Sequence, residues 1–112
     1  YFNLRISKCG GLFRTLRIAA LAKNAGVRLQ LGCLVGETAI LSAAGRALAG
    51  YLGELDYVEG SFGTYLLRED VSREDIRFGA DGRAGLLKGD GLGIEIKDSV
   101  LYKYSDKVIT LK

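Results

Sequence analysis

Hydrophobic and polar residues alternate in two short segments of the first half of the chain, and an apolar stretch of helical length follows each. Residues 2–7 read Phe-Asn-Leu-Arg-Ile-Ser, and residues 27–31 read Val-Arg-Leu-Gln-Leu; this two-residue period is typical of strands. Residues 12–25 and 38–49 are rich in the helix formers Leu and Ala. With a third short strand at residues 55–58, the pattern predicts β-α-β-α-β and a parallel sheet with right-handed crossovers.

The second predicted helix carries a single charge, Arg46, in the twelve residues 38–49. A helix that is apolar on most sides must be covered on most sides, and parallel strands are normally covered on both faces. Three strands and two such helices cannot bury this much apolar surface among themselves. We therefore expect this half to need either more of its own barrel or another copy of itself.

The second half of the chain changes character, and its clearest signal is Asp81-Gly82. This pair lies between two short apolar runs and predicts a β-hairpin over residues 75–87. The other expectations are a loop at residues 60–70, a turn at 89–93, a short segment Ile94-Glu95-Ile96, a short helix or turn at 100–104 and a last strand at 107–111.

Composition narrows the possible functions only a little. The 112 residues suffice for one modest domain, and the net charge of +3 is interspersed, with no Lys/Arg run. We therefore expect no nucleic-acid partner and, because the apolar runs are short, no membrane span. Cys9 and Cys33 are far apart and the chain has no His, which argues against zinc and favours two reduced thiols in a cytoplasmic protein.

The chain contains no Met and opens with Tyr1 directly inside an apparent strand. An opening in the middle of a pattern, together with the under-covered helices, predicts that the sequence is part of something longer.

The first candidate functional residue is Lys8. It follows the first strand and precedes Gly10 and Gly11, which allow a sharp turn into a helix. This places Lys8 at the carboxyl end of a strand, the edge at which α/β folds bind ligands. The competing interpretation is a plain solvated lysine at a strand end.

Three carboxylates are further candidates. Glu37 follows the second strand, where it is either a functional group or an anion that stabilises a helix N-terminus. Glu54 and Asp56 are two residues apart, a spacing that puts both on one face of a strand and lets them grip one cation. Their competing interpretation is a solvated acidic loop.

Four segments of the chain resemble those of a known protein family. The segment Asn3-Leu-Arg-Ile-Ser-Lys8-Cys-Gly-Gly11 resembles the sixth barrel strand of the enolase superfamily, in its muconate lactonizing enzyme, mandelate racemase and dipeptide epimerase branch. Gly32-Cys-Leu-Val-Gly-Glu37-Thr resembles the seventh strand, Glu54-Leu-Asp56 the eighth, and Gly91-Leu-Gly-Ile-Glu-Ile96 a segment near the chain end. Two departures are Glu-Leu-Asp where the epimerases have Asp-x-Asp, and Asp90 where the family commonly has Pro.

The resemblance implies an α/β fold that is the C-terminal third of a (β/α)₈ TIM-type barrel. Residues 1–58 would form strands six to eight with their helices. Residues 59–112 would form the loop after the eighth strand, the hairpin and a β-rich tail that returns toward a capping domain absent from this chain.

The resemblance also implies a chemistry. In this superfamily a base removes the proton α to a carboxylate, and Mg²⁺ holds the resulting enediolate. Lys8 would be the acid/base, Glu37 an active-site carboxylate, and Glu54 and Asp56 the groups that bind the α-ammonium of a dipeptide. The family's metal ligands lie on strands three to five and its Lys-x-Lys pair on strand two, so none falls in this chain.

We therefore expect the chain to be inactive alone, and its parent to be a Mg²⁺-dependent isomerase or lyase that acts on a small carboxylate substrate. The alternative is a self-standing small α/β binding or scaffold domain. In both cases the apolar helices predict self-association.

Overall fold

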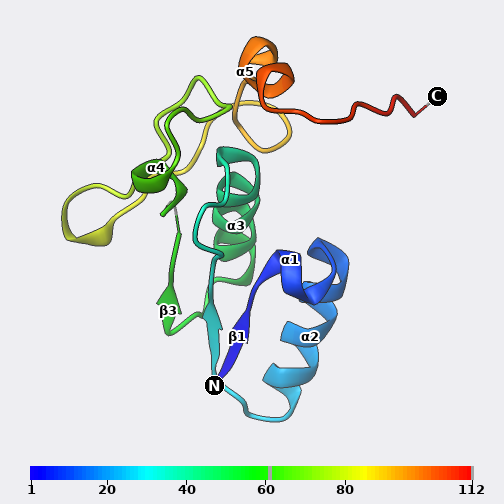
Figure 1. Cartoon of the computed structure of the whole chain (residues 1–112). Helices are drawn as coiled ribbons and strands as arrows, with labels where there is room; N and C mark the ends of the chain where they lie inside the picture. Colours follow the sequence, from blue (N-terminus) through cyan, green and yellow to red (C-terminus); the bar gives the residue numbers. More distant parts are fainter. Residues whose placement is uncertain (61, 112) are drawn as a thin grey trace.

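The computed structural model describes residues 1–60 and 62–111, and three short parallel strands form its organising sheet. The elements in chain order are β1 (Phe2–Leu4), α1 (Ile6–Cys9), α2 (Leu12–Asn24), β2 (Leu29–Leu31), α3 (Ala39–Leu52), β3 (Tyr57–Val58), α4 (Gly63–Leu66), the 3₁₀ turn η1 (Ala80–Gly82) and α5 (Asp98–Lys103) (Figure 1).

The strands lie in the order β1-β2-β3, and both pairings are parallel. Helices α2 and α3 are the crossovers, and both pack on the same face of the sheet, as expected when two right-handed crossovers step in one direction. One hydrophobic cluster joins them to the strands: Leu4, Ile6, Ala19, Ala22, Leu29, Leu31, Ala44 and Leu48. The predicted β-α-β-α-β order is confirmed.

The opposite face of the sheet is polar. Asn3 is in register with Gln30, and Gln30 with Tyr57; strand alternation directs this row away from the buried leucines. A Cβ built on Gly32 would lie 2.1 Å from Oδ1 of Asn3, so the absence of a side chain at Gly32 leaves room for the Asn3 amide. This face carries side chains suited to hydrogen bonding rather than to a dry core.

Two element boundaries differ from the sequence prediction. The first strand ends at Leu4 rather than at residue 7, because Ile6–Cys9 forms a single helical turn. Gly10, in the left-handed region at φ 84°, donates its N–H to the Ile6 carbonyl and closes that turn. Helix α3 continues past Gly50, and the chain leaves it at Gly53, with φ 69°.

In the second half, the predicted hairpin is present only as a turn. Asp81 and Gly82 both have positive φ, at 59° and 68°, as a two-residue hairpin turn requires, and Gly79 N donates to Arg83 O at 2.7 Å. No strands flank this turn among the described residues. Because its flanking residues 79–86 are exposed, they have little apolar burial to hold two strands together.

The remaining tail elements also differ in part. The segment predicted as a loop at 60–70 contains helix α4, and α5 confirms the short helix expected near 100–104. No strand forms at residues 107–111. In the described part of the tail, the β-rich prediction reduces to one isolated antiparallel bridge between Ser72 and Ile96.

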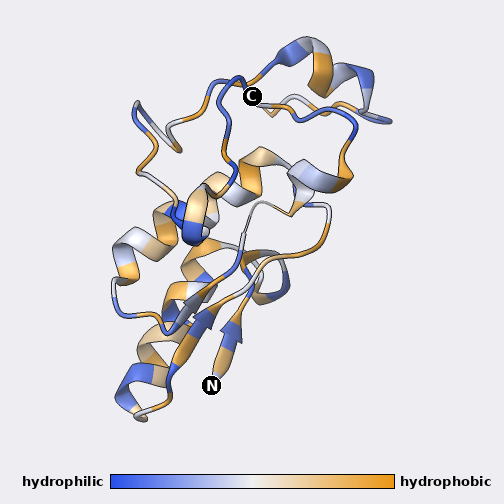
Figure 2. Cartoon of the chain, turned by 90° about the vertical axis from the view of Figure 1, so that its left-hand side faces the viewer, coloured by the Kyte–Doolittle hydropathy of each residue, from blue (hydrophilic) through white to orange (hydrophobic). Residues whose placement is uncertain are grey.

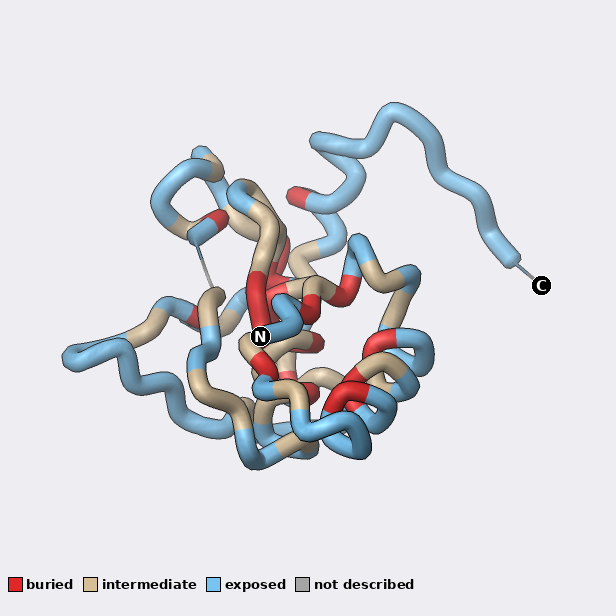
Figure 3. The backbone as a smooth tube through the Cα atoms, turned by 90° about the horizontal axis from the view of Figure 1, so that it is seen from below, coloured by how far each residue is buried: buried red, intermediate tan, exposed pale blue. Residues whose placement is uncertain are grey.

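Burial is concentrated where the sheet meets its helices, and a second small cluster ties the tail to α3 through Ala39, Val71, Ile76 and Val100 (Figure 3). Hydrophobic segments recur along the strands and along the helices beside them (Figure 2). Residues 101–111 are all exposed. Within the described residues, no helix combines the length and the hydropathy that crossing a membrane would need.

Candidate functional site

The three strands end at one edge of the sheet, beside α1 and α4 (Figure 1). The carboxyl edge of a parallel sheet is where α/β proteins bind ligands. Three segments reach it: α1 with Lys8 after β1, the Gly32–Thr38 loop after β2, and Glu59-Gly60 after β3. The structure therefore brings Lys8 and Glu37 to one edge, as the sequence predicted.

Lys8 lies in α1 and is exposed. The helical turn moves it one turn beyond the strand end, and Gly10 then reverses the chain into α2. A flexible, solvated amine at this edge can approach a substrate bound over the sheet.

Glu37 is half-buried at the end of the β2–α3 loop. Its Oε1 accepts a hydrogen bond of 2.7 Å from Leu34 N, and its own N donates to Leu34 O at 3.3 Å. The carboxylate thus closes its own loop with one oxygen. This contact fixes where the charge of Glu37 lies at the edge of the sheet.

Glu59 is a site residue that the sequence reasoning missed. It follows β3 directly, and its Oε1 accepts from Gln30 Nε2 at 2.5 Å while Oε2 accepts from Cys33 N at 3.4 Å. The signal that could have found it is its position immediately after a strand, the same relation that singles out Lys8 and Glu37. Glu59 therefore joins β2, β3 and the β2–α3 loop in one polar network.

Cys33 reports the electrostatics of this edge. Burial raises the pKa of its thiol above the ordinary value, and the charges of Glu37 and Glu59 raise the pKa further, because a thiolate beside carboxylates is disfavoured. Arg5 opposes them. A small pocket lies between Cys33, Glu37 and Glu59, with Ile6 among its lining residues. This edge thus carries two half-buried carboxylates beside a cavity of about 10 Å³, the size of one water molecule, and Arg5 is close enough to act on the charge of Cys33.

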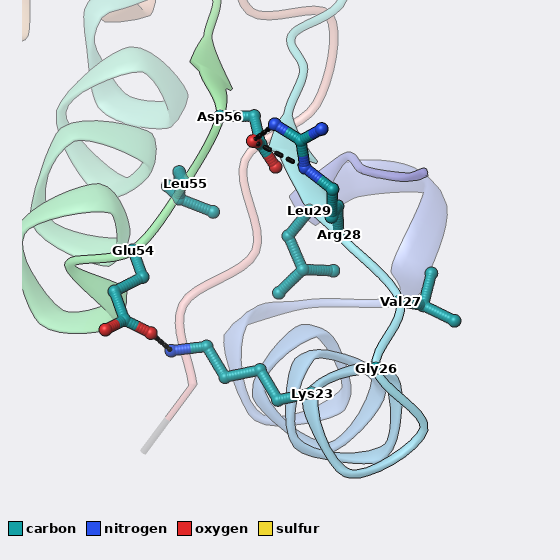
Figure 4. Close-up of a pocket in the computed structure, with 8 residues that line it drawn as sticks. All are labelled: Lys23, Gly26, Val27, Arg28, Leu29, Glu54, Leu55 and Asp56. Atoms are coloured by element: carbon teal, nitrogen blue, oxygen red, sulfur yellow. Dashed lines mark hydrogen bonds and ion pairs between the residues drawn. The ribbon is translucent and has the colours of Figure 1, made fainter.

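Glu54 and Asp56 lie at the opposite, amino-terminal edge of the sheet (Figure 4). Asp56 Oδ1 accepts from Arg28 Nε at 2.8 Å and also from Arg28 Nη2. Glu54 faces Lys23 Nζ at 4.0 Å, beside the same shallow pocket. These carboxylates have ion-pair partners of their own and are not brought to Lys8 or Glu37, so their substrate-binding role stays a prediction that the geometry does not support.

The placement of this pair follows from the α3 boundary. Because α3 extends to Leu52 and β3 begins only at Tyr57, both carboxylates precede the strand instead of lying along it. The amino-terminal face of a sheet of this class generally serves stability rather than chemistry.

Glu37 and Glu59 do not form a magnesium site on their own. Among the described residues, no group of three or more His, Cys, Asp or Glu side chains could hold a metal ion. Each of these two carboxylates has at least one oxygen that already accepts a hydrogen bond from the protein.

The chain is similar to known proteins in sequence and in fold. Residues 1–100 match the family described as enolase C-terminal domain-like. The chain belongs to this family. It is 33% identical over 94 residues to an L-Ala-D/L-amino acid epimerase from Maribacter sp. and 37% identical over 93 residues to muconate cycloisomerase 1 from Rhodococcus opacus. These alignments cover 84% and 83% of the chain.

The structural comparison agrees on the fold of this family member. N-succinyl Arg/Lys racemase from Bacillus cereus superposes with a TM-score of 0.72 over 94% of the chain, at 24% identity. The chain covers 27% of that structure, 26% of the epimerase and 24% of the cycloisomerase. It thus spans about a quarter of the length of the curated relatives it matches.

Proposed function

We propose that this chain forms part of the active site of an enzyme that removes the proton α to a carboxylate, as in an amino-acid racemase or epimerase. The observation that carries the proposal is Lys8 at the same sheet edge as the half-buried carboxylates Glu37 and Glu59. Family membership supports it. On this proposal residues 1–58 are the last third of a (β/α)₈ barrel, and residues 59–112 complete the final loop and tail.

The proton transfer assigns Lys8 the role of base. Its neutral amine would take the α-proton and become an ammonium, while the C–H electron pair moves onto the substrate carboxylate. Return of a proton from the opposite face inverts the carbon; loss of a β-substituent instead gives elimination. A divalent cation, when bound, stabilises charge on that carboxylate, and its ligands would come from outside the described residues.

Glu37 and Glu59 favour one substrate class. Two carboxylates at this edge would attract a substrate with an ammonium or guanidinium group. An amino-acid derivative with a basic group fits this field better than the muconate dianion. Muconate cycloisomerisation remains the second candidate, because the 37% identity to the Rhodococcus opacus enzyme favours it.

The test uses the polypeptide expressed from the natural gene, with Mg²⁺ and three probes: N-succinyl-L-arginine, L-lysyl-L-arginine and cis,cis-muconate. We expect deuterium to enter the α-position of at least one of the amino-acid probes. Lys8→Arg keeps the charge but provides a poorer base, so exchange should fall by about 10²- to 10⁴-fold, the range for loss of a general base. Lys23→Gln, at the amino-terminal edge, is the matched control and should retain exchange.

Two further variants separate the carboxylates. Glu54→Gln and Asp56→Asn should leave turnover of the active probe unchanged, whereas Glu59→Gln should raise KM. The 112-residue chain alone should give no exchange. An active Lys8→Arg variant, or no turnover of any probe by the natural polypeptide, would contradict the proposed function.

A further inference from the structure

Asp70 lies in the segment after α4, yet it binds the start of α3. Its Oδ1 accepts hydrogen bonds from Ala39 N at 2.8 Å and from Val71 N at 2.7 Å. Ala39 is the first residue of α3, and the residue before it, Thr38, makes no side-chain cap hydrogen bond. Asp70 therefore satisfies a helix N–H that would otherwise lack a local acceptor, and its negative charge suits the positive end of a 14-residue helix.

The same segment contacts the β2–α3 loop at a second point. A Cβ built on Gly63 would lie 1.8 Å from the Glu37 carbonyl oxygen, so α4 is packed directly on the Glu37 backbone. Two residues of this segment thus contact the start of α3: Gly63 packs on the Glu37 backbone, and Asp70 accepts the hydrogen bond from Ala39 N. Inside the loop, the Glu37 carboxylate is held by Leu34 N.

We propose that Asp70 is a positioning residue that fixes the Glu37 carboxylate at the carboxyl edge through the start of α3. The reasoning is geometric: only Thr38 separates Ala39 from Glu37, so a shift of the first turn of α3 moves Glu37 with it. The loop also carries Cys33, whose N–H holds Glu59. This inference rests on the proposed function, because it names a further residue on which that site depends.

The choice of variants follows from the atoms. Asp70→Ala removes the acceptor from both N–H groups. Asp70→Asn keeps one carbonyl oxygen for them but loses the charge, and it places an amide where the buried Oδ2 has no hydrogen-bond partner among the described residues. Asp106→Ala, an exposed carboxylate of the C-terminal tail, is the matched control.

The experiment is a double-mutant cycle with Glu37→Gln in the polypeptide expressed from the natural gene, with α-proton exchange on the better of the two amino-acid probes as readout. With Glu37 present, Asp70→Ala should lower kcat/KM by about ten- to a hundredfold, as small misplacements of active-site groups do. In the Glu37→Gln background the same change should cost no more than about twofold, because residues that act through each other are not additive. A merely structural role would instead lower kcat/KM by the same factor in both backgrounds.

Asp70→Asn keeps the proposal falsifiable if Asp70→Ala does not fold. With Glu37 present, Asp70→Asn should lower kcat/KM by about threefold. In the Glu37→Gln background it should leave kcat/KM unchanged. Equal factors in the two backgrounds, for whichever variant folds, overturn the inference. If the unsubstituted polypeptide turns over no probe, the proposed function itself fails; if it is active and the factors are equal, only the role of Asp70 fails.

Discussion

At the scale of single residues, the Cys33 thiol is a direct probe of where Glu37 lies. Its pKa is raised first by burial and then by the charges of Glu37 and Glu59. Glu37→Gln removes a negative charge that favours the protonated thiol, so we expect the pKa of Cys33 to fall and its alkylation to begin at a lower pH. The measurement is the rate of iodoacetamide modification against pH, by peptide mass spectrometry.

Cys9 provides the internal control for that measurement. It is a second free, partly exposed thiol in the same chain, and its profile should be the same in both proteins. A Cys33 profile that does not move with Glu37→Gln would contradict the placement of this carboxylate beside the thiol.

The sequence predicted Lys8 and Glu37 at the carboxyl edge of the sheet because each follows a strand, and that relation depends on local pattern alone. It missed Glu59 although β3, only two residues long, ends at Val58 as the predicted strand at residues 55–58 does, because the family resemblance assigned the carboxylate role at this strand to Glu54 and Asp56. The same short strand misled the prediction for Glu54 and Asp56. Their partners Lys23 and Arg28 are 31 and 28 residues away in sequence, so local pattern could not reveal the ion pairs.

At the scale of elements, the packing of α4 on the β2–α3 loop depends on Gly63. A methyl group at this position would lie 1.8 Å from the Glu37 carbonyl oxygen, so Gly63→Ala must push α4 away from the loop. We expect a loss of about 1 to 3 kcal/mol in the free energy of unfolding, the usual cost of forcing an extra group into a packed site. Urea unfolding followed by circular dichroism gives this value.

Gly45→Ala is the matched control, because it adds the same methyl group within α3 with nothing inside 4 Å of it. Removing a glycine from a helix interior should stabilise the protein by about 0.5 to 1 kcal/mol. Opposite signs for the two variants confirm that the contact, and not the loss of glycine, determines the effect. Equal destabilisation would contradict it.

The element boundaries show why prediction stopped where it did. Residues 6 and 7 continue the alternation of the first strand, and Ile6 is buried as expected, but its backbone is helical because Gly10 offers the left-handed geometry that closes a turn. In the tail, Asp81-Gly82 formed the turn that its φ preferences dictate. Strands on either side of this turn would also need pairing and packing contacts, and a turn motif in the sequence does not show whether those contacts exist.

At the scale of the whole molecule, the surplus of apolar surface inferred from the sequence is present in the structure. Phe13, Leu21 and Tyr51 on the two long helices are 86%, 70% and 78% exposed. The outer edges of β1 and β3 have no strand beside them in the described sheet. Both features agree with a chain that spans about a quarter of its curated relatives, and together they argue that the 112-residue chain alone will self-associate.

The geometry of the sheet specifies how that association should occur. Parallel extension pairs the β1 edge of one copy with the β3 edge of the next, a head-to-tail contact that does not close on itself. A charge on either edge should interrupt every such junction. We therefore expect Val58→Lys, on β3 and 41% exposed, to shift the 112-residue chain toward monomer in sedimentation velocity. Leu111→Lys, on the exposed tail, should leave the distribution unchanged. A Val58→Lys chain that stays as associated as the unsubstituted one would contradict the sheet-edge contact and assign the association to the exposed helix faces.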